Sequence, residues 1–219
     1  MLLANSCSVE SINAITSIVK SRGPIRNGDH LFREGQGARS IYIVQNGTVK
    51  CERVSSNGGV HVAGFFLSGD ILGCEDIGGG THCYDAIALE ESRVCEIPVD
   101  QLERLFSVYP DLQHCFLSRI SERIRSSERS LTDSFCLRAK HRLIGFLCDF
   151  YTRLSQRKRE MGSSIVLPMN KLDIANHLGI SPETLSRLLR ELEDERQIRN
   201  GLRQIELIDP ENLARYCNP

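Results

Sequence analysis

The 219-residue sequence contains no tryptophan, and no apolar run in it approaches the ~18 residues needed to span a bilayer. Its N-terminus also lacks a basic region followed by a hydrophobic block, which is the pattern of a signal peptide. With 41% hydrophobic and 25% charged residues, the composition is that of a globular protein. We therefore expect a cytoplasmic protein with no membrane segment.

No pair of cysteines is closely spaced, although the chain contains nine of them. Zinc sites and most iron–sulfur sites use Cys-x-x-Cys or similar spacings, so this sequence argues against both. An odd number of cysteines in a cytoplasmic chain also argues against a disulfide framework. Most of these thiols are expected to be reduced, buried and to pack as small hydrophobic side chains.

Enzyme motifs are absent as well, because the sequence shows no nucleophile–base pair, phosphate-binding loop or metal-ligand cluster. We therefore expect no enzyme, no catalytic residue, no metal site and no cofactor. The formal net charge is −1, with an acidic excess in residues 1–135 and a basic excess in residues 136–219. A basic C-terminal part is typical of a DNA-binding module that is joined to another domain.

Helical spacing of isoleucines predicts a short helix over residues 5–20, capped by Ser8 or Ser6. From Pro24 to Pro98, short segments rich in Val, Ile, Phe and Tyr alternate with glycines, which predicts a β-sandwich or barrel. Asn46-Gly47 and Asn57-Gly58 are two-residue hairpin signals.

After Pro98 the pattern becomes helical, with one helix predicted over 99–108 and a longer one over 111–134. The long helix carries apolar or small residues at alternating four- and three-residue steps, flanked by arginines and glutamates that we expect to be solvated, Arg123 among them. Such a narrow seam is typical of a helix that meets a partner helix, so we expect a homodimer. The predicted dimerisation residues are Leu112, Phe116, Ile120, Ile124, Ser127 and Leu131.

The C-terminal part predicts a winged helix. A helix over 137–154 follows a hinge near Ser134, with Leu143, Phe146, Leu147 and Phe150 expected to pack beneath the helices that follow. A strand-like segment at 163–168 comes next, and a two-stranded hairpin closes the chain around Asn200-Gly201.

Between that strand and the hairpin, residues 170–190 have the pattern of a helix-turn-helix. Asn170 is a good N-cap for a first helix with apolar positions at Leu172, Ile174, Ala175 and Leu178, and Gly179 provides the break. Ser181 caps a second helix that begins at Pro182 and buries Leu185, Leu188, Leu189 and Leu192. The polar face of such a second helix reads bases in the DNA major groove. An ordinary surface helix hairpin is the alternative for this segment taken alone. The predicted DNA-binding residues are Glu183, Ser186, Arg187, Thr184, Ser181, Arg190, His177 and Lys171.

The order of these parts resembles the CRP/FNR superfamily of bacterial transcription regulators over nearly the whole chain. Within it the sequence is similar to the FNR branch, in the stretches PIRNGDHLFREG, SIYIVQNGTVK, GFFLSGDILG, VCEIP and LDIANHLGISPETLSRLL. The resemblance implies an α+β fold with three parts. These are an N-terminal β-roll (1–108) like a cyclic-nucleotide-binding jelly roll, a dimerisation helix (109–134) and a winged helix-turn-helix (135–219).

By this resemblance the protein is an activator or repressor whose partners are double-stranded DNA and RNA polymerase. FNR-type recognition helices carry Glu-x-x-Ser-Arg, which Glu183, Ser186 and Arg187 match. The implied operator is an inverted repeat similar to TTGAT-N4-ATCAA.

The sensing part departs from the patterns of the superfamily. Cyclic-AMP-binding members carry an arginine in the loop that corresponds to 73–86, and this loop has none, so a buried phosphate would lack a partner. FNR proteins hold a [4Fe–4S] cluster with three N-terminal cysteines and one that matches Cys95, but only Cys7 precedes residue 51. The alternative to an effector-independent regulator is a sensor that uses redox thiols, an unorthodox cluster, haem through His82 or Cys74, or another small ligand in the β-roll. Its candidate residues are Cys95, Cys74 and Cys83.

Overall fold

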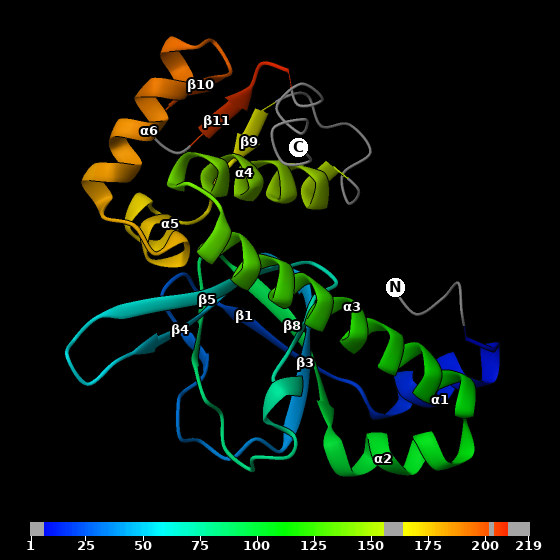
Figure 1. The fold of residues 1–219 in the computed structure, drawn as a ribbon. Helices are drawn as coiled ribbons and strands as arrows, with labels where there is room; N and C mark the ends of the chain where they lie inside the picture. The colour runs from blue at the N-terminus through cyan, green and yellow to red at the C-terminus, as the bar shows by residue number, and fades with distance from the viewer. Residues whose placement is uncertain (1–6, 156–163, 202–203, 210–219) are drawn as a thin grey trace. The chain divides into compact units, whose positions relative to one another are not determined.

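The computed structural model describes residues 7–155, 164–201 and 204–209 (Figure 1). The chain divides into two compact units, one formed by residues 1–53 and 63–129 and the other by residues 54–62 and 130–219. Among the described residues, no helix is long and apolar enough to cross a membrane. Each unit is described by itself.

Two four-stranded antiparallel sheets form the β-roll. Their strand orders are β1-β8-β3-β6 and β2-β7-β4-β5. The strands are β1 (Lys20–Ile25), β2 (His30–Phe32), β3 (Ser40–Asn46), β4 (Thr48–Val54), β5 (Val60–Leu67), β6 (Ile71–Leu72), β7 (Asp85–Ala88) and β8 (Ser92–Pro98). The predicted all-β N-terminal part is confirmed, but β1 was not predicted. It lies at a sheet edge, and all its residues except Ile25 are exposed, so it shows no alternation of polar and apolar side chains.

The two predicted hairpins have different outcomes. Asn57-Gly58 joins β4 and β5, which are neighbours in one sheet, so this hairpin is confirmed. The Asn46-Gly47 hairpin is wrong, because β3 and β4 belong to different sheets and the chain crosses between them here. Gly47 has φ +86°, and a Cβ atom at this position would clash with Ser92 at the start of β8. Glycine is required for this crossing, and the dipeptide signal does not distinguish it from a hairpin.

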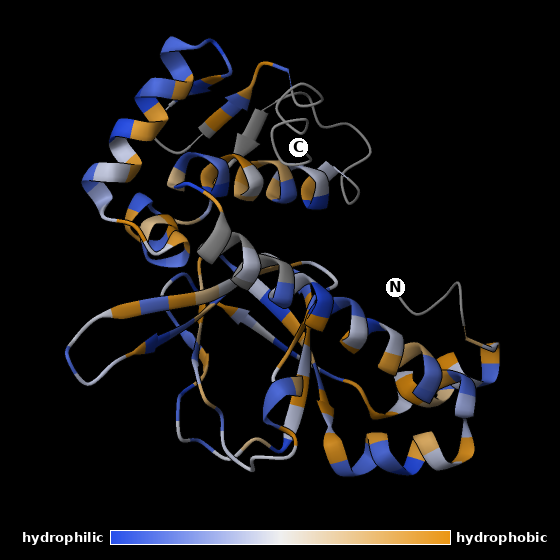
Figure 2. Ribbon diagram, viewed as in Figure 1, coloured by the Kyte–Doolittle hydropathy of each residue, from blue (hydrophilic) through white to orange (hydrophobic). Residues whose placement is uncertain are grey.

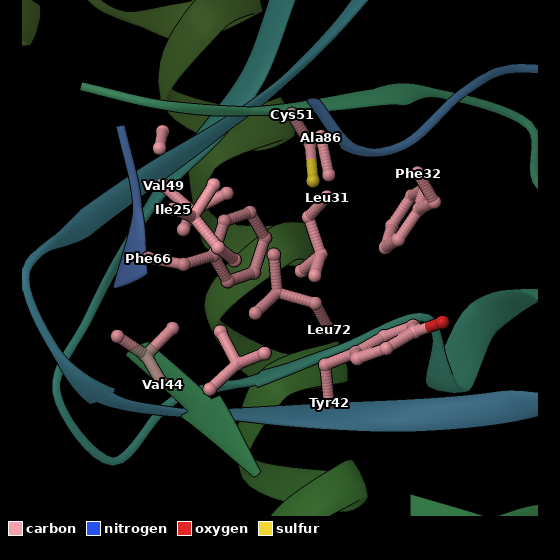
Figure 3. Packing of buried hydrophobic residues seen from close by; sticks show 12 residues of the cluster. Ile25, Leu31, Phe32, Tyr42, Val44, Val49, Cys51, Phe66, Leu72 and Ala86 are labelled. Carbon is pink, nitrogen blue, oxygen red and sulfur yellow. The ribbon is translucent and has the colours of Figure 1, made fainter. Parts of the chain in front are cut away.

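The interior of the roll is filled by apolar side chains from both sheets (Figure 3). Twelve buried residues make up this core: Ile25, Leu31, Phe32, Tyr42, Val44, Val49, Cys51, Phe66, Leu72, Ala86, Ala88 and Val94. A second core lies where helices α1 (Val9–Ile18), α2 (Val99–Val108) and the first turns of α3 (Pro110–Cys136) meet the sheet. Its fully buried members are Ile15, Ile41, Ile97, Leu102 and Leu112.

Helix α1 is fastened to the start of α3 by a carboxylate. The Ser8 amide donates to Asp111 Oδ2 at 2.8 Å, and the Ser11 hydroxyl donates to Asp111 Oδ1 at 2.6 Å. Ser8 is also the N-cap of α1, as predicted, because its side chain accepts from the Ser11 amide. These bonds lower the pKa of Asp111 to about 2, the side chain of Ser11 contributing most and the backbone of Ser8 next.

The second unit is a winged helix. It contains α4 (Ala139–Ser155), α5 (Lys171–Leu178) and α6 (Pro182–Asp194), and strands β9 (Ser164–Val166), β10 (Ile198–Asn200) and β11 (Gln204–Leu207). The closing sheet has three strands in the order β10-β11-β9, rather than the two that were predicted, because β9 pairs with β11. Residues 202–203, which follow the predicted turn at Asn200-Gly201, and residues 156–163 lie outside the described part of the chain. The predicted α+β class is confirmed.

Candidate DNA-binding surface and sensing loop

Both helices of the helix-turn-helix begin with a side-chain cap, as predicted. Asn170 accepts from the Asp173 amide at 2.8 Å, and Asp173 accepts from the Asn170 amide at 3.3 Å, which completes a capping box. Gly179 ends α5 in the left-handed conformation with φ +63°. Ser181 then accepts from the Thr184 amide at 3.2 Å and fixes the first turn of α6.

Helix α6 presents a polar face outward on a buried leucine stripe, which Figure 2 shows as alternating hydrophobic and hydrophilic positions. The four predicted stripe residues are all buried: Leu185, Leu188, Leu189 and Leu192. Leu172 on α5, predicted to be apolar and packed, is 54% exposed, because it lies on the outer side of that helix.

The outward face of α6 lines an open groove that includes Glu183, Ser186, Arg187 and Arg190. The side chain of Arg187 is 70% exposed, and its Nη1 atom lies 4.0 Å from a carboxylate oxygen of Glu191. The pKa of Glu183 is lowered, first by its own backbone N–H and then by the Ser181 hydroxyl, so this exposed residue is ionised at neutral pH. The sequence therefore identified a set of residues that share one solvent-facing surface.

Three other predicted DNA-binding residues lie at the starts of α5 and α6. Lys171 is exposed at the start of α5. The hydroxyl of Ser181 lies 3.1 Å from that of Thr184, so both groups already have partners within the cap.

His177, which was expected to be exposed beside the turn, is instead half-buried. Its ring lies 5.5 Å from that of Phe146, and Nδ1 lies 2.9 Å from the Val62 carbonyl oxygen, both partners being in the same unit. Burial lowers the pKa of His177 despite this hydrogen bond, so the ring is neutral at pH 7 and brings no positive charge to a phosphate.

Two basic residues of α4 hold the helix-turn-helix in place, and sequence reasoning did not single them out. Arg142 donates from Nε and Nη2 to the Leu178 carbonyl at the end of α5, at 3.3 and 3.2 Å, and from Nη1 to the Leu137 carbonyl at 2.9 Å. Lys140 donates to Glu191 at 2.8 Å and to Glu195 at 2.6 Å. No local pattern signals contacts that join residues 36 to 55 positions apart.

The predicted dimerisation residues of α3 are not all exposed. Leu112 is 1% exposed in the core of its own unit, and Phe116 packs against that core, so neither is available to a partner helix. Leu117 and Ile124, seven residues apart, are 55% and 53% exposed, and Ser127 is exposed too. The exposed apolar residues therefore begin at Leu117 rather than at Phe116, because the first turns of α3 pack against the roll. Ile120 is half-buried, and the side chain of Leu131 is outside the described part of the chain.

The loop at 73–86 contains a buried pair of a histidine and a carboxylate. His82 and Asp76 are 2% and 3% exposed, and Nδ1 of His82 lies 2.8 Å from Oδ2 of Asp76. The His82 ring stacks on Phe32 with 3.7 Å between ring centroids and an interplanar angle of 11°. A Cβ atom at Gly73 would lie 3.3 Å from the His82 ring, so glycine allows the close approach. His82 is thus packed on protein atoms rather than lying in an exposed loop.

Arg123 was expected to be solvated, but α3 brings it onto the roll. Its guanidinium lies 4.5 Å above the ring of Phe66, bonds to the Ile71 carbonyl, and lies 3.4 Å from Glu75. This cation is near the loop that would hold a nucleotide phosphate, although the loop itself has no arginine. Its charge is already paired with Glu75.

The candidate sensor cysteines are half-buried, and the pKa of each thiol is raised. Burial raises the pKa of Cys95, raises that of Cys74 to about 11 and, with a hydrogen bond to Asp76, raises that of Cys83 to about 12. The thiolate, which reacts with oxidants and binds metals, is therefore scarce at neutral pH. Within the described residues, no group of three or more His, Cys, Asp or Glu side chains is arranged to hold a metal ion.

Two models of known protein families match separate parts of the chain. The model of a Crp-like helix-turn-helix domain matches residues 141–216, and that of a cyclic nucleotide-binding domain matches residues 23–109.

Individual relatives extend over most of the chain. It is 35% identical over 181 residues to the fumarate and nitrate reduction regulatory protein of Vibrio cholerae, covering 81% of this chain and 71% of that protein. It is 31% identical over 217 residues to the transcriptional activator protein Anr of Pseudomonas protegens, covering 98% and 87%. Among solved structures, FixK2 from Bradyrhizobium japonicum superposes with a TM-score of 0.80 at 23% identity, covering 92% of this chain and 98% of FixK2.

Proposed function

Since the chain belongs to the CRP/FNR family of transcription regulators, with a DNA-binding helix-turn-helix, we propose that it binds an FNR-like inverted repeat as a homodimer without an effector. The proposed operator is similar to TTGAT-N4-ATCAA. The observation that carries the proposal is the outward face of α6, where Glu183, Ser186 and Arg187 lie together on a doubly capped helix-turn-helix.

The chemistry of this face fits the proposed bases. The guanidinium of Arg187 matches O6 and N7 of a guanine, and Glu183 accepts from the amino group of a cytosine or adenine. Ser186 serves a thymine or a phosphate. Lys171 and Arg190 add cations that suit the phosphate backbone. His177 is left out of this set, because its ring is half-buried and neutral.

Dimerisation is proposed through the exposed apolar residues of α3 from Leu117 onward. Leu117 and Ile124 are exposed at heptad spacing, and a parallel partner helix would cover both. An inverted repeat requires such a dimer, because each half-site is read by one recognition helix.

The proposal that no cyclic nucleotide is needed is supported by two features of the roll. The loop at 73–86 carries no arginine, and Arg123, which α3 brings close to it, already bonds to Glu75 and the Ile71 carbonyl. His82 stacks on Phe32, and its Nδ1 atom lies 2.8 Å from Asp76, so this nitrogen is already engaged within the protein. The proposal that no four-thiolate cluster is needed is supported by the cysteine positions, because only Cys7 lies before residue 51, and by the raised pKa values of Cys74 and Cys83.

The test is binding to a duplex that contains the full repeat, to one with a single half-site and to a scrambled sequence. Protein purified in air, with nothing added, is expected to bind the full repeat with two chains per duplex and to prefer it over the scrambled sequence by ~10³-fold or more. Equal, strongly salt-dependent binding to all three duplexes would contradict the operator assignment. Tight binding of one chain to a half-site, with no gain from the second, would contradict the dimer.

A further inference from the structure

The DNA-facing groove on α6 carries an unexpected balance of charge. Two arginines, Arg187 and Arg190, line it together with four carboxylates, Glu183, Glu191, Asp194 and Glu195. DNA is a polyanion, and carboxylates close to its phosphates weaken binding. Left alone, this surface would repel the backbone that it has to approach.

The excess acid is concentrated at one end of the helix. Glu183 lies in the first turn, where the helix dipole favours a negative charge, but the other three carboxylates lie in the second half. The last turn of α6 has no basic residue to balance them or the negative end of the dipole. A cation for this end has to come from another element.

Helix α4 supplies that cation through Lys140. Its ammonium lies 2.8 Å from Glu191 and 2.6 Å from Glu195, which are one turn apart on the same side of α6. Partial burial works to lower the pKa of Lys140, but the hydrogen bonds to the two glutamates outweigh it and raise the pKa. The hydrogen bond from Lys140 also lowers the pKa of Glu191. A single ammonium therefore partly neutralises two carboxylates of the groove.

Glu191 also lies beside the residue proposed to read a base. One of its oxygens faces Lys140, and the other lies 4.0 Å from Nη1 of Arg187. Without Lys140, the full charge of Glu191 would act on Arg187 and hold its guanidinium along the helix, away from the groove. With Lys140 in place, part of that charge is compensated, and Arg187 is 70% exposed.

We propose that Lys140 is a positioning residue for DNA recognition, which holds Glu191 and Glu195 so that Arg187 is free to reach a base. The inference rests on the proposed function, because it requires that α6 faces the DNA. Lys140 acts through the two glutamates and touches no DNA itself.

The test measures operator affinity over a range of salt concentrations for K140M, K140R and the triple variant K140M/E191Q/E195Q. We expect K140M to bind the operator about tenfold more weakly, because Glu191 would then hold Arg187 along the helix and uncompensated carboxylates would face the DNA. K140R and the triple variant are expected to restore most of the affinity. The salt slope of K140M should equal that of the unaltered protein, because no phosphate contact is lost. K50M is the matched control, since it removes a lysine from a 2.6 Å ion pair with Glu52 on the roll and should leave binding unchanged.

Three results would overturn the inference. The first is an unchanged affinity in K140M, and the second is a salt slope reduced by about one, which would mean that Lys140 contacts a phosphate directly. The third is a failure of the triple variant to recover, with its thermal unfolding equal to that of the unaltered protein. If the unaltered protein does not select the operator, the proposed function fails first and the inference with it, so the two failures are distinguishable.

Discussion

The histidine of the loop at 73–86 and the candidate DNA-binding residues of α6 differ in how far they are exposed. In the roll, some polar groups are turned inward and satisfied by one another, as in the Asp76–His82 pair and the bond from the Ser40 hydroxyl to Glu96. In the winged helix, Arg187 and Glu183 are turned outward, on a helix whose inner face is wholly apolar. A polar group that is satisfied inside the protein is not available to a ligand, whereas an exposed one is.

The largest effect is expected inside the roll. Asp76→Ala leaves the His82 imidazole buried without its partner, so we expect the free energy of unfolding to fall by about 3–5 kcal/mol. Urea unfolding of the two proteins measures this. Asp100→Ala is the control, because it removes an exposed ion pair with Arg104 and should cost less than about 1 kcal/mol. A loss below that level for Asp76→Ala would mean that Asp76 and His82 are not paired as described.

A smaller effect is expected on the outward face of α6. Arg187→Ala removes the group proposed to grip a guanine, so we expect operator binding to weaken by about 1–3 kcal/mol and selectivity to relax at one base pair. Competition with duplexes substituted one pair at a time measures both quantities. Full affinity and selectivity in this variant would contradict the proposal that α6 reads bases in the DNA major groove.

The cap that positions α6 should contribute less than the base contact. Ser181→Ala removes the acceptor for the Thr184 amide, so stability should fall by about 1 kcal/mol, and Ser181→Asp should restore it. Thermal unfolding of the three proteins provides the comparison. If the aspartate variant is as unstable as the alanine variant, capping is not what Ser181 contributes.

The smallest effect is expected at the contact between α1 and α3. The pKa of Asp111 is about 2 in the folded protein and ~3.9 in an unfolded chain, so its contribution is complete above pH ~4 and is lost as the pH falls towards 2. In the Asp111→Asn variant, the free energy of unfolding should therefore depend less on pH between pH ~4 and ~2, and the roll should stay folded at pH 7. An acid limb identical to that of the unaltered protein would show that Asp111 is not held by Ser8 and Ser11.

Local signals made much of the molecule predictable from sequence. The caps at Asn170 and Ser181, the break at Gly179 and the leucine stripe of α6 each depend on residues within a few positions of one another. These signals fixed the helix-turn-helix and the face on which Glu183, Ser186 and Arg187 lie. The sequence predicted best those features that depend on interactions between residues close together in the chain.

Contacts between distant residues could not be predicted in the same way. Whether Leu112 faces a partner or its own core depends on where α3 meets the sheet, and the helical spacing is the same in both cases. Arg123 was expected to be solvated and Lys140 was not singled out, because their partners Glu75 and Glu191 lie about 50 residues away in the chain. His82 became a packed residue only because Asp76 and Phe32 meet it inside the roll.

Operator affinity with and without the effectors of the family tests the account most directly. The dissociation constant for the TTGAT-N4-ATCAA duplex would be measured with protein purified in air, with added cyclic AMP, and after anaerobic reconstitution with iron and sulfide. We predict the same value, within a factor of about two, in all three conditions. Binding that is tighter by tenfold or more after either treatment would contradict the account and would show that the roll senses a ligand.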